Sequence, residues 1–165
     1  MPKISAILHA HNDELRIGRA LDSLRPCDEI IVVDHDSSDE TMKVARKHGA
    51  SVKKGLPGVE PGAYVIDARN DWILCLQPNE ALSEALEASL LEFKDRSDDE
   101  EPATCYNVAL REEDGAGWRT LPAETRLANR SRVNWTGQIP PHMEGAPALA
   151  GELMRFQEPA ARKSA

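Results

Sequence analysis

The sequence predicts an α/β fold built on a mostly parallel β-sheet, and two observations carry this prediction. Three apolar segments, 4–8, 29–34 and 72–76, have the composition of strands that are covered on both faces. Helical patterns lie between them, and this alternation is typical of parallel strands joined by right-handed crossovers. A chain of 165 residues is long enough to form one such domain with its own hydrophobic core.

Helix signals follow the first two strands. Asn12 or Asp13 is placed to cap a helix that continues to about residue 25, where Pro26 ends it. Ser37 and Glu40 have the spacing of a capping box, in which each side chain accepts a hydrogen bond from the backbone of the other residue. This pair predicts the start of a second helix.

The later elements are less regular. Residues 51–54 and 104–110 have the composition of strands, and residues 83–93 carry the apolar stripe of a helix. Residues 115–142 show no clear pattern. The stretch 145–165 is rich in alanine and proline and is expected to be a mobile tail.

Charge and cysteine content exclude several classes of function. The chain has 28 acidic and 20 basic residues, a net charge of −8, which argues against a nucleic-acid partner or an anionic membrane surface. Most of the acidity lies in residues 76–114, where 12 acidic and three basic residues give −9. No apolar run has the length of a signal peptide or a transmembrane segment, and the three separated cysteines form no disulfide or zinc motif. These features predict a cytoplasmic protein.

Three polar loops mark the place to search for a ligand site. Parallel sheets bind ligands beyond the carboxyl ends of their strands. The loops 9–14, 34–39 and 77–80 each follow directly after an apolar strand. We therefore expect these three loops to form one site.

The same loops carry motifs with a known order. Each motif joins a polar loop to an apolar strand: His-Asn-Asp-Glu at 11–14, Asp34 followed by Ser-Ser-Asp-Glu-Thr at 37–41, and Asn-Asp-Trp at 70–72 followed by Gln-Pro-Asn-Glu at 77–80. Over residues 3–93 they resemble the nucleotide-sugar-binding half of family 2 glycosyltransferases, which have the GT-A fold. The likeness is greatest to the branch that contains lipopolysaccharide-core glucosyltransferases.

The resemblance implies both an architecture and an activity. It implies a GT-A-like, Rossmann-like domain over residues 1–144, with a nucleotide-sugar-binding half at 1–93 and a shortened acceptor half at 104–144, followed by the tail. It implies transfer of a sugar from a nucleotide-sugar donor, in particular a UDP-sugar, to an acceptor that the sequence does not identify.

The donor-binding residues follow from the resemblance as well. Asp34, which ends a strand and needs no capping duty there, would accept the imide N–H of uracil. Asn12 and the backbone around Ala10 would line the base pocket, and His11 would pack on the base. Asp36 would contact the ribose, although turn and cap chemistry explains Asp36, Ser37 and Asp39 equally well. The expected nucleotide-sugar-binding set is Ala10, His11, Asn12, Glu14, Asp34 and Asp36.

The metal motif of the family is altered in this chain. The family uses Asp-x-Asp to bind Mn²⁺ or Mg²⁺, because hard cations prefer anionic oxygen ligands. Gln77 and Asn79 stand at these positions and keep only a neutral amide oxygen. Glu80 is retained as a substitute ligand, and His142 lies about two residues from the place of the family's histidine. The resemblance therefore implies a divalent cofactor, Mn²⁺ or Mg²⁺, whose two carboxylate ligands are replaced in this chain.

The residues that would stabilise the departing diphosphate and deprotonate the acceptor also match the family pattern poorly. Relatives carry Arg-Asn or Lys-Asn where this chain has Gly62-Ala63, with Arg69 as the nearby cation. Transfer needs a base for the acceptor hydroxyl. Candidates by location are Glu112, Glu113, Asp114 and Glu124, of which the first three also fit a solvated charged loop.

Two other functions remain open at this point. The lost carboxylates fit a catalytically degenerate GT-A domain that binds a nucleotide or a protein without transfer. A metal-dependent hydrolase that uses His9, His11 and Asp34 is a minor alternative, since imidazoles and carboxylates at neighbouring strand ends bind zinc. The usual strand-end His-x-His, however, belongs to eight-stranded barrels, for which this chain is too short.

Overall fold

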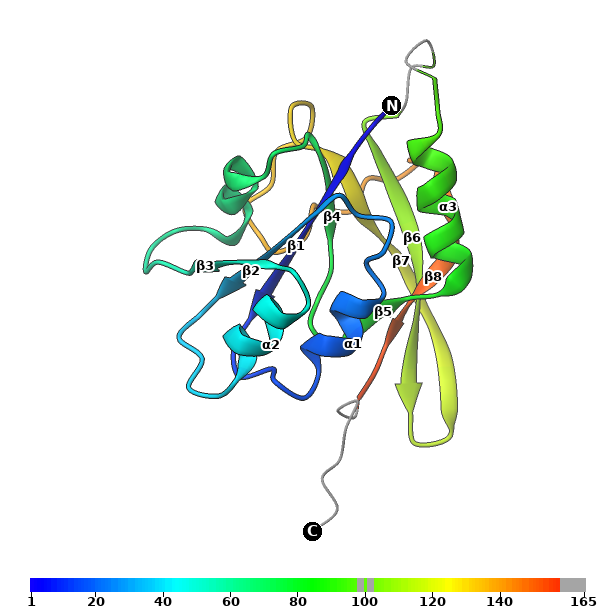
Figure 1. The fold of residues 1–165 in the computed structure, drawn as a ribbon. Helices are drawn as coiled ribbons and strands as arrows, with labels where there is room; N and C mark the ends of the chain where they lie inside the picture. Colours follow the sequence, from blue (N-terminus) through cyan, green and yellow to red (C-terminus); the bar gives the residue numbers. More distant parts are fainter. Residues whose placement is uncertain (98–99, 101–102, 158–165) are drawn as a thin grey trace.

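An eight-stranded mixed sheet forms the centre of the fold (Figure 1). The structure is a computed structural model and describes residues 1–97, 100 and 103–157. Within these residues the strands lie in the order β3-β2-β1-β4-β7-β6-β8-β5. The predicted α/β class with a sheet flanked by helices is confirmed.

Four parallel strands make up one half of the sheet. They are β1 (Ile4–Ala10), β2 (Glu29–Asp34), β3 (Ser51–Lys54) and β4 (Trp72–Cys75). The strands predicted at 29–34 and 51–54 have these bounds. β1 extends beyond the prediction to Ala10, so that His9 is a strand residue and pairs in register with Val33.

The other half of the sheet contains three strands that the sequence pattern did not predict, β5, β7 and β8. Its members are β5 (Glu80–Leu82), β6 (Cys105–Asp114), β7 (Gly117–Asn129) and β8 (Ala148–Arg155). β6 and β7 form a long antiparallel hairpin, and β8 lies between β6 and β5. The first half of β7 extends past the core and is mostly exposed, which explains why it lacks an alternating apolar pattern.

The prediction of a mobile tail at 145–165 is wrong for residues 148–155, which form β8. β8 is a sheet strand, and Leu153 within it is fully buried. Gly151 allows β8 to approach α3 (Glu84–Lys94), because a Cβ there would lie 2.2 Å from the backbone nitrogen of Leu86. Residues 158–165 of the expected tail lie outside the described residues.

The helices cover one face of the sheet. α1 (Ile17–Asp22) begins later than predicted, because residues 13–16 form a turn in which the Asp13 carbonyl accepts from the Arg16 N–H at 2.9 Å. The predicted capping box is not formed at α2 (Thr41–Lys47), where the Asp39 carboxylate instead accepts from the Thr41 N–H at 2.9 Å. α3 begins at Ser83, whose hydroxyl accepts from the Leu86 N–H at 3.2 Å.

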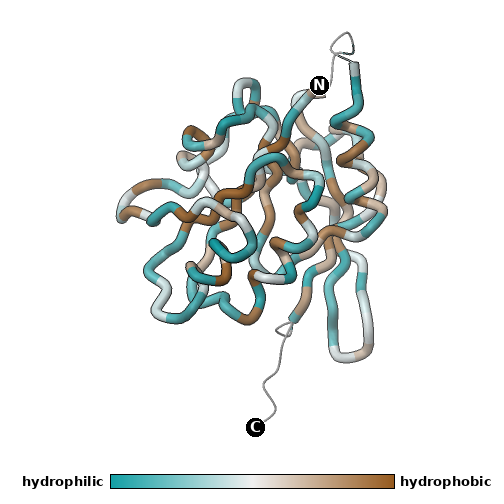
Figure 2. Tube along the Cα trace, in the orientation of Figure 1, coloured by the Kyte–Doolittle hydropathy of each residue, from teal (hydrophilic) through white to brown (hydrophobic). Residues whose placement is uncertain are grey.

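Two hydrophobic layers hold the sheet between its coverings. The larger layer joins β1, β4, β6 and β7 to the three helices, and the smaller joins the opposite face to the 3₁₀ helix η1 (Pro61–Asp67). Figure 2 shows apolar residues concentrated in the central strands and polar residues along the outer loops. None of the described helices has the length and apolar character needed to span a membrane.

A buried ion pair links three strands in the second half of the sheet, β5, β7 and β8. The guanidinium of Arg126 on β7 donates to both carboxylate oxygens of Glu80 on β5, at 2.7 and 2.8 Å, and both side chains are 0% exposed. Arg155 on β8 also donates to Glu80, at 3.0 Å. Burial alone would lower the pKa of Arg126, but the hydrogen bonds and charge of Glu80 outweigh burial and raise it.

The Arg126→Met variant tests this ion pair. The substitution leaves the Glu80 carboxylate buried with only Arg155 as its cation, so we expect the free energy of unfolding to fall by about 3 kcal/mol. Arg119→Met is the matched control, because Arg119 forms an exposed pair with Glu112 and should cost less than about 1 kcal/mol. Urea unfolding measures both, and equal losses in the two variants would contradict the assignment.

Candidate functional site

Two adjoining cavities lie at the carboxyl ends of the parallel strands. In Figure 1 the arrowheads of β1 and β2 mark two of these strand ends. The histidine cavity, of about 340 Å³, is lined by His9, Ala10, His11, Asp13, His35, Pro61 and Gln138. The amide cavity, of about 300 Å³, is lined by Asp13, Arg16, Gln77, Pro78, Asn79 and Gln138. Because Asp13 and Gln138 line both, the two cavities form one divided site at the edge where such sheets bind ligands.

Asp34 ends β2 beside the histidine cavity. Its neighbour His35 lines this cavity, as does Ala10, its register partner on β1. One carboxylate oxygen of Asp34 accepts from the Ser37 N–H at 3.1 Å, in the turn that follows β2. The other oxygen is buried without a hydrogen-bond partner, although Asp34 is only 3% exposed. An unpaired buried carboxylate oxygen is costly, which makes it a candidate acceptor for a ligand donor.

A pair of stacked histidines forms part of the wall of the histidine cavity. His9 Nδ1 lies 2.9 Å from His35 Nε2, and the two rings stack with centroids 5.2 Å apart. His9 is 7% exposed, and burial together with the charge of His35 lowers its pKa to about 4. Gly55 makes room for this pair, because a Cβ there would lie 2.4 Å from His35 Nδ1.

The loop 11–14 is clamped to the loop after β2. Asn12, with φ of 51°, accepts from the Ser38 N–H at 2.8 Å, and its own N–H donates to the Ser37 hydroxyl at 2.9 Å. The Glu14 carboxylate accepts from the Glu40 N–H at 3.2 Å. These two residues of the expected donor-binding set therefore shape the site without lining either cavity.

The remaining members of that set are divided between the cavity and the surface. Ala10 and His11 line the histidine cavity, and His11 Nδ1 donates to the His35 carbonyl. Asp36 is exposed, has φ of 53° and lines neither cavity. The left-handed backbone of Asp36 fits its alternative reading as a turn residue.

The expected metal ligands are separated by the structure. Gln77 and Asn79 line the amide cavity, whereas Glu80 is enclosed in the ion pair with Arg126. His142 is exposed in the loop between β7 and β8 and lines neither cavity. Among the described residues no group of three or more His, Cys, Asp or Glu side chains is arranged to hold a metal ion. The hydrolase alternative with His9, His11 and Asp34 therefore lacks its ligand cluster.

Arg16 is the cation that the sequence pattern missed. It lines the amide cavity, its side chain is 39% exposed, and its guanidinium lies 3.8 Å from the Asp13 carboxylate. A helix starting at Asn12 or Asp13 was expected to contain Arg16, and only the turn at 13–16 places it at the cavity.

Two positions expected near a diphosphate do not serve one here. Arg69 pairs with Glu29 at 3.0 Å, at the amino end of β2 and therefore at the opposite edge of the sheet. Gly62 packs so closely on the 135–136 segment that a Cβ would lie 2.0 Å from the Trp135 carbonyl oxygen. No side chain fits at Gly62, which explains physically why a basic residue is absent there.

The candidate bases lie away from both cavities. The Glu124 carboxylate is held by Arg126 at 3.4 Å and Arg155 at 3.5 Å. Asp114 stands at the end of β6, and its carboxylate accepts from the Ala116 N–H in the hairpin turn at 2.9 Å. Asp13, which no motif singled out as a base, is the carboxylate that lines both cavities.

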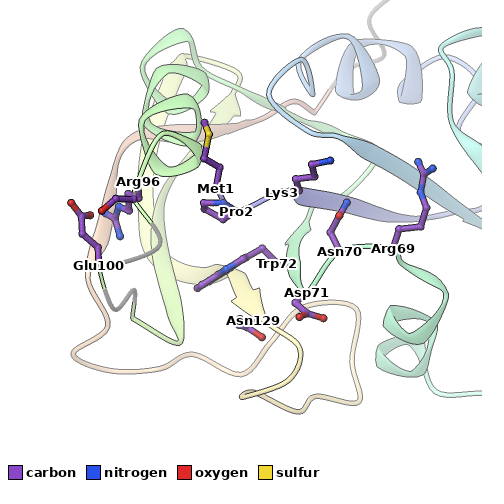
Figure 3. Close-up of a pocket in the computed structure, with 11 residues that line it drawn as sticks. Met1, Pro2, Lys3, Arg69, Asn70, Asp71, Trp72, Arg96, Glu100 and Asn129 are labelled. Carbon is purple, nitrogen blue, oxygen red and sulfur yellow. The ribbon is translucent and has the colours of Figure 1, made fainter.

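A larger cavity, of about 470 Å³, lies at the opposite edge of the sheet. Figure 3 shows its lining side chains around the amino ends of β1 and β4, among them Lys3, Asn70 and Trp72. Arg69 and Asp71 in its wall are already paired with Glu29 and Arg130. Its position is unlike that of ligand sites in parallel sheets, so size alone does not make it the functional site.

Comparison with known sequences points to glycosyltransferases. No family model matches the chain. A protein of Rickettsia typhi named as an uncharacterized glycosyltransferase is 34% identical over 114 residues, which cover 67% of this chain and 39% of that protein. A Rickettsia felis protein with the same description is 35% identical over 114 residues, 67% of this chain and 40% of that protein. The matched segment thus spans about two fifths of the length of these relatives.

Comparison with solved structures identifies the fold. A mycobacterial protein superposes with a TM-score of 0.58 at 16% identity, over 98% of this chain and 68% of that protein. The glucosyl-3-phosphoglycerate synthase of Mycobacterium tuberculosis, in complex with Mn²⁺, UDP and phosphoglyceric acid, superposes with a TM-score of 0.51 at 20% identity, over 70% of this chain and 45% of that enzyme. The chain therefore has the α/β fold of GT-A glycosyltransferases, as its motifs predicted.

The histidine pair predicts a pH-dependent stability. The pKa of His9 in the folded protein is about 4, below its ordinary value of 6.5. Between these two pH values, His9 of the unfolded chain is protonated while His9 of the folded chain is not. The stability present above pH 6.5 should therefore decrease as the pH falls toward 4, by up to about 3 kcal/mol. Urea unfolding between pH 6.5 and 5 measures this slope above the range in which carboxylates titrate.

Two variants separate His9 from the other titrating groups. His9→Asn should reduce the pH dependence of the unfolding free energy by the equivalent of about one bound proton, whatever its effect on stability at pH 7. His142→Asn, at the exposed histidine, should keep the wild-type slope. An unchanged slope in His9→Asn would show that His9 is not the titrating group.

Proposed function

We propose that the chain binds a UDP-sugar in the divided site and is part of a family 2 glycosyltransferase, which transfers the sugar to an acceptor. The observation that carries this proposal is the unpaired, buried carboxylate oxygen of Asp34 at the end of β2. The imide N–H of uracil is a donor of the kind that this oxygen lacks, and a charged acceptor strengthens such a bond. Relatives named glycosyltransferases support the same reading.

The two cavities suit the two parts of such a ligand. Each has a volume near the lower end of the range of about 300–1,000 Å³ typical for ligand pockets. The histidine cavity has stacked imidazole rings in its wall, on which a flat base packs. The amide cavity offers hydrogen-bonding groups and Arg16 to the phosphates.

Each expected residue then has a proposed role. His11 packs on the base beside the Ala10 backbone, whereas Asp36, which lines neither cavity, shapes the turn after β2. Asn12 and Glu14 hold the two loops in place. Residues 1–93 form the donor half, and residues 104–144 contribute to the acceptor side of the same domain.

A second candidate function is a GT-A domain that binds the nucleotide without transfer. The observation that favours it is the lack of a free carboxylate at the expected positions. Glu80 and Glu124 are both paired with arginines. The two carboxylates of the family motif are replaced by Gln77 and Asn79. Release of UDP from UDP-glucose by a chain that binds it would favour the transferase. Binding without release would favour the second candidate.

Calorimetric titration of the Asp34→Asn variant tests the donor site. The amide cannot replace the charged acceptor, so uridine and UDP should bind about 10- to 100-fold more weakly than to the wild type. Asp22→Asn on α1 is the matched control, since its carboxylate is exposed and pairs with His48. Absence of uridine and UDP binding to the wild type, or equal affinities in Asp34→Asn, would reject the proposed site.

A further inference from the structure

We infer that the amide cavity binds the nucleotide's diphosphate without a divalent cation, through Arg16 and the side-chain amides of Gln77 and Asn79. This inference rests on the proposed function and specifies how the same site meets the charge of its ligand. It departs from the Mn²⁺ complex of the structurally similar synthase. The argument depends on which donor groups face the cavity.

The two motif positions do not fit a hard divalent cation. Mg²⁺ and Mn²⁺ are held by carboxylate oxygens, which supply negative charge as well as coordination. Gln77 and Asn79 supply neutral oxygens only. Glu80, which follows them, is fully buried and uses both of its oxygens on Arg126, so it has no oxygen to offer the cavity.

Asp13 is the carboxylate that remains in the cavity wall, and its surroundings also disfavour a cation. One of its oxygens accepts from the His11 N–H at 2.9 Å, and the other lies 3.8 Å from the Arg16 guanidinium. A divalent ion on Asp13 would therefore lie within several ångströms of a fixed positive charge. At that range the two positive charges repel each other appreciably in a partly solvated site.

The same groups suit an anion. The planar guanidinium of Arg16 can donate two parallel hydrogen bonds to a phosphate, and its charge is permanent. Its ion pair with Asp13 is long and partly exposed, so exchanging it for a phosphate costs little. The amides of Gln77 and Asn79 have N–H donors where aspartates would repel the phosphates.

The loop that carries these amides is held in a fixed shape. The Gln77 N–H donates to Glu80 at 2.9 Å, and the Asn79 carbonyl accepts from the Phe156 N–H at 2.9 Å. Arg16 is likewise placed by the turn from Asp13. Three donors are therefore presented to one cavity by backbone that the buried ion pair and the turn keep in position.

Titration of uridine and UDP, each in EDTA and in Mn²⁺, tests the inference. Uridine reports the base subsite alone, and the gain from uridine to UDP reports the diphosphate. For the wild type we expect UDP to bind at least about tenfold more tightly than uridine in EDTA, with a change of less than about twofold on adding Mn²⁺.

Substitution of Arg16 identifies the source of the gain. Arg16→Gln should lose about tenfold in UDP affinity and leave uridine affinity unchanged, and Arg16→Lys should recover part of the loss. Arg46→Gln on α2 removes the same charge from an exposed position and should change neither affinity. Circular dichroism and uridine binding report whether each variant is folded.

The reverse substitution offers an independent test. Gln77→Asp combined with Asn79→Asp should weaken UDP binding about tenfold in EDTA and make Mn²⁺ restore it, because two carboxylates repel phosphates and attract the cation.

The outcomes separate this inference from the proposed function. A UDP gain that appears only with Mn²⁺, or that persists in Arg16→Gln, would overturn the inference while leaving the nucleotide site intact. Failure of the wild type to bind uridine or UDP would overturn the proposed function, and the inference with it.

Discussion

The ion pair between Glu80 and Arg126 is the constraint on which the rest of the structure depends. Burying two charges is unfavourable unless they are paired and hydrogen-bonded, and here Glu80 is bonded by Arg126, Arg155 and the Gln77 N–H, whereas the buried Nε of Arg126 has no partner among the described residues. Arg126 also donates to the Cys75 carbonyl at the end of β4. One cluster thereby joins β4, β5, β7 and β8 and sets the shape of the loop that faces the amide cavity.

The ion pair also decides which charged groups remain in the wall of the amide cavity. Because the ion pair consumes the acid that follows the altered motif, the cavity wall contains amides, Arg16 and Asp13 in place of a carboxylate cluster. In the neighbouring histidine cavity, burial keeps His9 in its neutral form at neutral pH. Stacked imidazole rings beside a donor-rich cavity match a ligand with a flat base and a charged tail.

Much of the fold was predictable because local pattern and tertiary role agree in the parallel half. The strands at 29–34 and 51–54 are regular apolar or β-branched segments, and Ser83 has the chemistry of a helix cap. β5, β7 and β8 were not predicted. Half of β7 is exposed on both faces, so it lacks an apolar pattern. β8 is a strand because it pairs with β5 on one side and β6 on the other, and its own composition does not predict it.

By itself the sequence determined the α/β class, the loops at the carboxyl ends of the strands and the motifs that they carry, because these depend on short-range order along the chain. Only the tertiary structure decided which side chains meet. It placed Arg16 at the cavity and Arg69 at the opposite edge of the sheet, and it left one oxygen of Asp34 unpaired. It also placed Glu80 in the core. Charge partners come from strands far apart in sequence, and spacing along the chain carries no record of such contacts.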